Sequence, residues 1–182
     1  MTFFLRTLSR EFLNYRRKPG LFINPLIFCG LVVFIFVVGI GPDKTELNPV
    51  ASIFILVASV LSVLISAESV YAQDFEEGTL ELIVVSSNSL LIYSLAKSVA
   101  HWVLTFLPLI LMVPLMGIGL FLDVDQIRVL CFGILLISPT VTLLASIGAA
   151  ITICLPRNAV LTAILVLPFY LPPMVFVTGL FE

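Results

Sequence analysis

Carboxylates gather in one short stretch of a chain that is otherwise apolar. Residues 68–89 read ESVYAQDFEEGTLELIVVSSNS, and no basic residue follows this stretch until Lys97. Its acids are Glu68, Asp74, Glu76, Glu77 and Glu81. Asp74 with Glu77 three positions later has the form of a capping box, which predicts a helix from about Asp74 to Val85. The polar run from Ser86 to Ser89 would end this helix.

The predicted helix is amphipathic and acidic. Its apolar side chains are Phe75, Leu80, Leu82, Ile83 and Val84, which lie beside the carboxylates of Asp74, Glu76, Glu77 and Glu81. A partner protein binds such a helix in a groove, where charge sets the orientation and apolar anchors supply most of the affinity. Residues 74–82 would then be a partner-binding segment, Thr79 included, in which Gly78 permits a bend. A solvated loop helix without a partner fits these residues equally well.

Chemistry other than binding has little support in the sequence. There is no Walker A loop, zinc-ligand spacing, nucleophile elbow or dinucleotide fingerprint, so we expect no catalytic, cofactor-binding or metal-ligating residues. His101 is the only histidine, which excludes a bis-histidine haem site within one chain and favours a role in packing or hydrogen bonding. Lys97 and His101 lie four residues apart on one helix face, and with Trp102 they form a candidate interface.

The composition is that of an integral membrane protein. The 182 residues are 60% hydrophobic and 11% charged, and their mean hydropathy is +1.22. A soluble domain has about 45–50% apolar and about 25% charged residues. The three cysteines are isolated in apolar segments, where we expect them to be small buried hydrophobes. The basic residues crowd the first eighteen positions, which is an orientation signal beside a span and indicates no nucleic-acid role.

Five segments are apolar and long enough to cross a ~30 Å hydrocarbon core as helices. They are residues 21–40, 49–67, 90–122, 128–155 and 159–180, and residues 68–89 connect the second to the third. Residues 1–18 form an amphipathic pattern, with Leu5, Leu8, Phe12 and Tyr15 on one stripe and Arg6, Arg10, Asn14 and Arg17 on another. This pattern predicts a helix in the membrane interface with its arginines among the headgroups. The fold class is therefore all-α, a polytopic transmembrane helical protein with one membrane-embedded domain, residues 1–182.

Three further features of the spans have structural consequences. Small residues recur at helical spacing in the second and fourth spans, which predicts close helix packing in lipid: Ser52, Ser59, Ser62 and Ser66, and Ala145, Gly148, Ala149 and Thr152. Pro168, Pro172 and Pro173 predict that the fifth span is bent or broken. No acidic or basic residue lies near the middle of any span, which disfavours a secondary transporter.

Basic residues also predict the topology. With the N-terminus inside, seven of them are inside (Arg6, Arg10, Arg16, Arg17, Lys18, Lys97 and Arg157) and two are outside (Lys44 and Arg128). Cytoplasmic loops carry the excess of Lys and Arg, so the N-terminus and the acidic segment are expected to be cytoplasmic.

Several motifs resemble one family in the same order along the whole chain. The stretch 74–81, DFEEGTLE, resembles the cytoplasmic motif of the haem exporter protein B family of cytochrome c maturation. Residues 96–102, AKSVAHW, resemble the entry to that family's third span. The supporting matches are Asn24-Pro25-Leu26 with Phe28, Ile40-Gly41-Pro42, residues 147–152 (IGAAIT) and residues 167–172 (LPFYLP).

The resemblance implies a permease subunit of an ABC transporter. In that family the permease pairs with a soluble ABC ATPase and works with a tryptophan-rich, haem-handling membrane protein, and ATP hydrolysis releases a haem-loaded chaperone outside the inner membrane. ATP and haem would be held by those partners, with no cofactor bound by this chain, whose only tryptophan is Trp102. The lipid bilayer and a second copy of the chain are the other candidate partners. The implied location is a bacterial inner membrane, with a mitochondrial inner membrane as the alternative.

Some features depart from the family pattern. The family usually has six spans and this chain gives five, so the chain is either truncated or a shortened variant. Glu68–Ala72 and Ser86–Asn88 stand where the family tends to have basic residues and a proline.

The expected function is the coupling of a partner's ATP hydrolysis to release of the chaperone or to haem export. The alternative is a passive membrane scaffold, which would tolerate a hydrolysis-deficient ATPase. An intramembrane enzyme is disfavoured because paired catalytic groups are lacking. Leu80→Asp is expected to abolish co-purification of the ATPase.

Overall fold

The chain is an all-α bundle, as the sequence predicts. A computed structural model describes residues 2–41, 43–67, 69–86, 89–154 and 159–179, and these ranges contain helices and no strand. The helices are α1 (Thr2–Arg17), α2 (Gly20–Ile40), α3 (Lys44–Ala67), α4 (Ser69–Glu76), α5 (Thr79–Val85), α6 (Leu90–Gly119), α7 (Val124–Thr152) and α8 (Ala159–Thr178).

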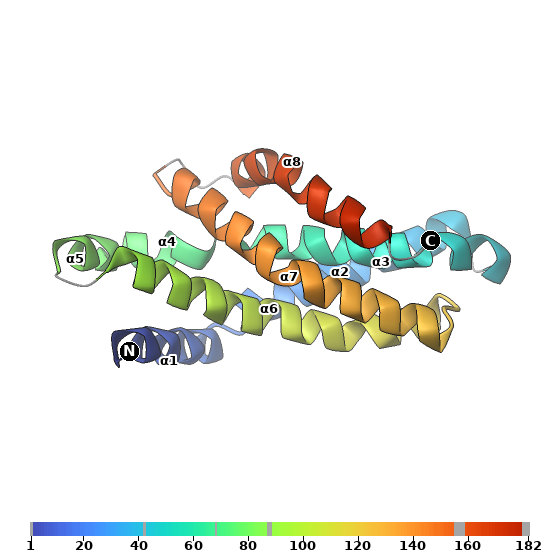
Figure 1. The fold of residues 1–182 in the computed structure, drawn as a ribbon, viewed down its shortest axis with the longest axis horizontal. Helices are drawn as coiled ribbons and strands as arrows, with labels where there is room; N and C mark the ends of the chain where they lie inside the picture. The colour runs from blue at the N-terminus through green and yellow to red at the C-terminus, as the bar shows by residue number, and fades with distance from the viewer. Residues whose placement is uncertain (1, 42, 68, 87–88, 155–158, 180–182) are drawn as a thin grey trace.

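The long helices run along the long axis of the molecule (Figure 1). α2 packs on α3, α6 packs on α7, and α8 packs on α7 and α3. The short helices α4 and α5 lie at one end of the bundle, where α1 packs against α6. The first turns of α3 meet the α6–α7 connection at the other end, where Asn48 Nδ2 donates to the Phe121 carbonyl over 2.6 Å.

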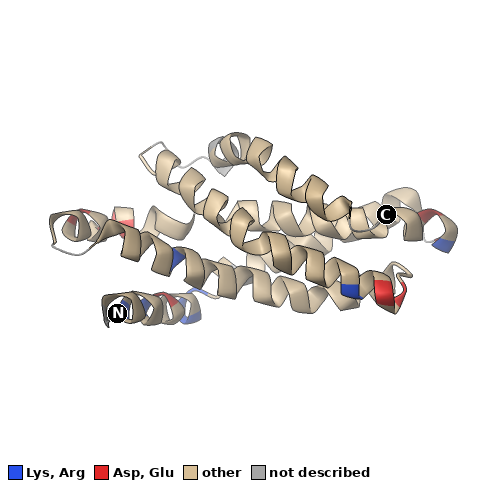
Figure 2. Cartoon of the chain, in the orientation of Figure 1, with Lys and Arg blue, Asp and Glu red and all other residues tan. Residues whose placement is uncertain are grey.

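The lengths and surfaces of the helices are those of a multi-pass membrane protein. α2, α3, α6 and α7 are each long and apolar enough to cross a membrane, and the described part of α8 adds a shorter apolar helix, Thr162–Thr178. Large apolar side chains face outward along the middle of these helices, among them Phe34, Leu111 and Leu115. Such a surface is stable against lipid and unstable in water. Charged residues are confined mostly to the two ends (Figure 2).

Several predicted boundaries were wrong by a few residues. α3 begins at Lys44, five residues before the expected start at Pro49, because Pro is tolerated in the first turns of a helix. α7 begins at Val124 instead of residue 128. A capping box is present there, between Asp123 and Gln126, and its Asp-x-x-Gln spacing could have been read from the sequence. Pro42 of the motif Ile40-Gly41-Pro42 and the predicted ends of the fourth and fifth spans, at 155 and 180, lie outside the described residues.

The small-residue faces do form close contacts. Ser59, Ser62 and Ser66 are buried in α3, and each hydroxyl donates to a carbonyl of its own helix. A Cβ added at Gly148 of α7 would lie 2.0 Å from Val166 Cγ2 of α8, so only glycine permits this helix approach.

Of the bend or break predicted for the fifth span, the break is absent, because α8 is one helix through Pro168, Pro172 and Pro173. The expectation about the cysteines needs correction. Cys29 is buried as predicted, but Cys131 is half-buried and Cys154 is exposed. Isolation in an apolar segment indicates a membrane position and does not distinguish a side chain that faces the bundle from one that faces outward.

Candidate functional site

The acidic segment is two short helices separated by a turn at Gly78. α4 ends at Glu76, and α5 begins at Thr79 with Gly78 as its N-cap in the left-handed conformation, φ +68°. The predicted single helix from Asp74 to Val85 was therefore wrong. Asp74 lies in the last turn of α4. It does not cap a helix, because its carboxylate accepts hydrogen bonds from other parts of the chain. Glu68, Ser87 and Asn88 lie outside the described residues.

Asp74 is buried and binds two cations from distant parts of the chain. Its side chain is 2% exposed. Its Oδ2 accepts hydrogen bonds from Lys97 Nζ and from the Tyr93 hydroxyl of α6. Its Oδ1 accepts from Arg10 Nη2 of α1 at 2.8 Å. A buried carboxylate requires such partners, because an unpaired charge away from water is strongly unfavourable.

Glu11 of α1 completes the cluster. Its Oε1 lies 3.5 Å from Lys97 Nζ and 3.2 Å from Arg10 Nη2, and the side chain is 7% exposed. Two anions therefore face two cations, so the group is neutral as a whole. We call Arg10, Glu11, Asp74, Tyr93 and Lys97 the charge cluster. It joins α1, α4 and α6 where the chain would otherwise bury isolated charges.

Aromatic rings enclose the ammonium group of the cluster. Lys97 Nζ lies 5.6 Å from the centroid of the Tyr71 ring and 5.6 Å from that of the Tyr93 ring. This geometry permits cation–π attraction in addition to the ion pairs. The Tyr71 hydroxyl bonds Ser146 Oγ of α7 at 2.7 Å, and through it α4 is also tied to α7.

A second polar network lies one helical turn further along α6. Tyr15 OH lies 3.0 Å from His101 Nδ1, and Ser66 Oγ lies 3.3 Å from His101 Nε2. Burial, and then the nearby Glu11 carboxylate, raise the pKa of the Tyr15 hydroxyl above its usual value, so this hydroxyl keeps its proton and donates. Ser66 already donates to the Val63 carbonyl, so its oxygen accepts from His101. A neutral imidazole protonated at Nε2 satisfies both bonds.

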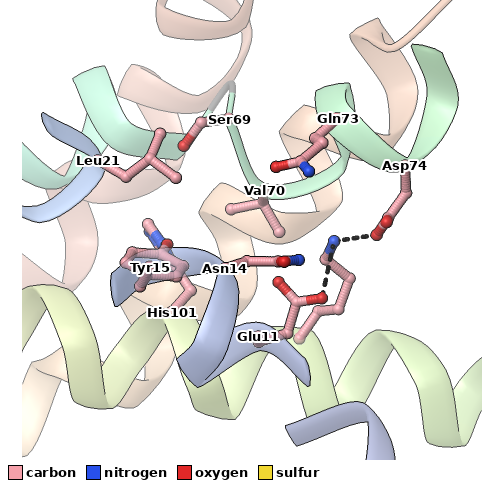
Figure 3. Close-up of a pocket in the computed structure, with 10 residues that line it drawn as sticks. Glu11, Asn14, Tyr15, Leu21, Ser69, Val70, Gln73, Asp74 and His101 are labelled. Atoms are coloured by element: carbon pink, nitrogen blue, oxygen red, sulfur yellow. Dashed lines mark hydrogen bonds and ion pairs between the residues drawn. The ribbon is translucent and has the colours of Figure 1, made fainter. Parts of the chain in front are cut away.

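A small cavity separates the two networks (Figure 3). Its volume of about 20 Å³ is sufficient for one water molecule. Polar side chains of α1, α4 and α6 dominate its lining, including Glu11, Asn14, Gln73 and Asp74. In Figure 3 dashed lines reach Asp74 and Glu11 from one ammonium group between them. No group of three or more His, Cys, Asp or Glu residues within the described ranges could hold a metal ion.

The structure separates the predicted site residues into an inner and an outer set. Lys97 and His101 of the candidate interface are buried inside the chain, where Lys97 bonds Asp74 and His101 bonds Tyr15 and Ser66. Trp102 is half-buried, and its Nε1 donates to Ser138 Oγ of α7 at 2.8 Å. Gly78, Thr79 and Leu80 are half-buried, and Leu80 packs on a cluster of Val70, Tyr71, Tyr93 and Ala149. The outer set is exposed: Phe75, Glu76, Glu77, Glu81 and Leu82.

Val85 and Leu91 add apolar side chains to the outer set, in which Leu82 is already highly exposed. Leu82 is 73% exposed, Val85 is 87% exposed, and Leu91 at the start of α6 is 74% exposed. α6 has 30 residues, about 45 Å at 1.5 Å per residue, which exceeds a ~30 Å hydrocarbon core. Lys97 precedes Gly119 by 22 residues, about 33 Å along the helix. With Gly119 at one edge of such a core, the charge cluster would lie at the other edge and the outer set would project beyond it.

Sequence reasoning missed Arg10, Glu11 and Tyr93 as members of the site. A signal was available for one of them, Glu11, which is the only acid in the basic N-terminal segment, while Lys97 is the only charged residue of α6. A lone acid among the bases of α1 and a lone base in the apolar helix α6 suggest that the two pair. Which acid pairs with which base could not be read from the spacing.

Comparisons with known proteins match nearly the whole chain to one family. Residues 2–182 match the family model described as CcmB protein. Relatives named heme exporter protein B include those of Pseudomonas aeruginosa, 38% identical over 94% of this chain and 77% of the relative, and of Haemophilus influenzae, 37% identical over 98% of this chain and 81% of the relative. The Escherichia coli K12 relative is 37% identical over 86% of this chain and 71% of its own length.

Proposed function

The chain belongs to the CcmB protein family, and from this membership we propose that it is the transmembrane permease subunit of an ABC transporter complex of haem export and cytochrome c biogenesis. In this role it couples ATP hydrolysis by a partner ATPase to release of a haem-loaded chaperone. The observation that supports the coupling role is the α4–α5 segment, which lies at one end of the bundle (Figure 1) and is bonded to α1 and α6 through Asp74.

The outer set has the properties of a docking surface. Its carboxylates, Glu77 and Glu81 among them, would face basic residues of the ATPase and set its orientation. Leu82 and Val85 would supply the buried apolar area that carries most of the affinity. Leu80 is not suited to this role because it packs within the chain, and Asp74 is not available because it is buried.

The charge cluster gives a docked ATPase a mechanical connection to the spans. Asp74 lies four residues before Gly78, and its bonds reach Arg10 of α1 and Lys97 of α6. A displacement of α4 by the ATPase would move these helices with it, since breaking the buried pairs would cost more than a rigid-body tilt.

Location and partners follow from the same proposal. The protein lies in the bacterial inner membrane with its N-terminus and the α4–α5 segment on the cytoplasmic side, as the excess of basic residues at that end favours. Its partners are the soluble ATPase, which binds ATP, a tryptophan-rich membrane protein that handles haem, and the haem chaperone. This chain acts on haem only through those partners.

Co-purification of the ATPase tests the docking surface. Leu82→Asp should reduce recovery of the ATPase at least tenfold, while the amount of protein inserted in the membrane stays unchanged. Val124→Asp is the matched control, because Val124 is 63% exposed at the opposite end of the bundle. Recovery equal to wild type with Leu82→Asp would remove the outer set from the interface.

A second measurement separates coupling from scaffolding. With a hydrolysis-deficient ATPase the complex should assemble and yet fail to mature cytochrome c. Normal maturation under these conditions would identify the protein as a passive scaffold.

A further inference from the structure

One face of α1 is uncovered by any other part of the described chain. Its exposed apolar side chains are Leu5, Phe12 and Leu13, which are 54%, 37% and 53% exposed. Exposed basic side chains lie among and beside them: Arg6, Arg16, Arg17 and Lys18. At 100° per residue Arg16 falls between Leu5 and Leu13, so apolar and cationic groups are interleaved on this face.

The buried partners of α1 determine which face is outward. Thr7, Glu11 and Tyr15 lie at intervals of four residues and are buried, with Glu11 paired to Lys97 and Tyr15 bonded to His101. The predicted apolar stripe is thus divided, because Tyr15 faces α6 while Leu5 and Phe12 face away from it. The polar contacts with α6 outweigh the apolar stripe in setting the rotation of α1.

Burial of Glu11 also determines the charge of the outward face. Glu11 is the only acid among residues 1–18, and its carboxylate is occupied by Lys97 and Arg10 inside the bundle. The outward face therefore carries positive charge without a compensating acid. Because Glu11 and Arg10 contact Lys97 and Asp74, this face lies level with the charge cluster, about 33 Å along α6 from Gly119, where a ~30 Å hydrocarbon core would end.

We propose that the outward face of α1 binds anionic phospholipids of the adjacent leaflet. The guanidinium groups of Arg6 and Arg16 would bind headgroup phosphates, for which their planar forks are suited. Leu5, Phe12 and Leu13 would contact the upper acyl chains, as in an interfacial helix. An acidic protein surface would also complement the positive charges of this face. It would leave Leu5, Phe12 and Leu13 without the acyl-chain contacts that an interfacial helix makes.

Native mass spectrometry of the purified full-length chain tests this proposal. The protein would be released from nanodiscs of phosphatidylcholine with phosphatidylglycerol, and the retained lipids would be counted. The wild type should retain phosphatidylglycerol in preference to phosphatidylcholine. Arg6→Gln/Arg16→Gln should reduce this preference roughly 30-fold, since each cation near the surface contributes on the order of a fivefold attraction.

The matched control removes two positive charges at the other end of the bundle. Lys44→Gln/Arg128→Gln has the same net charge. It should keep the preference of the wild type, because Arg128 is paired with Asp125 and Lys44 has Asp43 and Glu46 as neighbours in sequence. Equal preference in Arg6→Gln/Arg16→Gln and the wild type would overturn the proposal. If Arg6→Gln/Arg16→Gln retained lipids as the wild type does but lost co-purification of the ATPase, the proposal would also be overturned, because α1 would then bind a protein. The lipid measurement uses no ATPase, so it is independent of the proposed coupling role.

Discussion

Lys97 of α6 donates to Asp74 of α4 in the interior of the bundle, although the two residues are 23 positions apart in sequence. Their side chains are 4% and 2% exposed. Both residues also contact α1, through Glu11 and Arg10 respectively. This ion pair and its contacts with Arg10 and Glu11 thus hold α1, α4 and α6 together at one end of the molecule.

The first prediction concerns the charge balance of this cluster. Asp74→Asn leaves the two cations facing one anion and should destabilise the protein by about 3 kcal/mol. Asp74→Asn/Lys97→Met leaves one charge of each sign and should be more stable than the sum of the single changes by about 1 kcal/mol or more. Thermal unfolding in detergent measures both effects.

The exposed pair Asp125–Arg128 provides the control for that prediction. Asp125→Asn should change stability by less than about 1 kcal/mol, because a surface ion pair contributes little. Additive effects of the Asp74 and Lys97 changes would show that the two residues are not coupled.

The second prediction concerns the turn between α4 and α5. Gly78 has φ +68°, and a Cβ added there would meet no heavy atom within 4 Å. Gly78→Ala should therefore cost about 1 kcal/mol through backbone strain alone, and Gly78→Asn should cost less because Asn tolerates this conformation. Gly39 of α2 has equally open surroundings without a positive φ, so Gly39→Ala should not destabilise. Equal thermal stability of Gly78→Ala and Gly39→Ala would contradict the left-handed turn.

The third prediction concerns the contact between α7 and α8. Gly148→Ala places a methyl group against Val166 and should destabilise by about 1–3 kcal/mol. Val166→Ala combined with Gly148→Ala makes room for that methyl and should recover part of the loss. Gly30→Ala, which adds a methyl in open space, is the control. Helix crosslinking and thermal unfolding report the effect, and a fully stable Gly148→Ala protein would refute this close approach.

The fourth prediction is a pH dependence. The pKa of the Tyr15 hydroxyl is raised by burial and then by Glu11, so the folded state holds this proton more tightly than the unfolded state does. The resulting stability is fully present below the usual tyrosine pKa of about 10 and falls above it by up to ~1.4 kcal/mol per pH unit. Tyr15→Phe removes this dependence, so its stability should fall less steeply between about pH 10 and pH 11. Parallel unfolding curves for the two proteins would exclude a buried Tyr15 hydroxyl.

The sequence by itself determined the all-α membrane class and the approximate positions of the long helices. It also determined the small-residue faces that pack closely. Hydropathy and helical spacing are local properties, so a window of about twenty residues contains the information needed for each span. Helix ends were less certain, because caps such as Asp123 and tolerated prolines such as Pro49 shift them by several residues.

Only the tertiary structure decided what the charged residues of the site do. Asp74 has the spacing of a cap yet is an inward-facing partner of Lys97 and Arg10, and the latter lies 64 positions away in sequence. Such pairing depends on how α1 and α4 are rotated against α6, and no local pattern encodes that rotation. The rotation is selected because burying a charge without a partner costs more than exposing Leu5 or Phe12 at a lipid boundary.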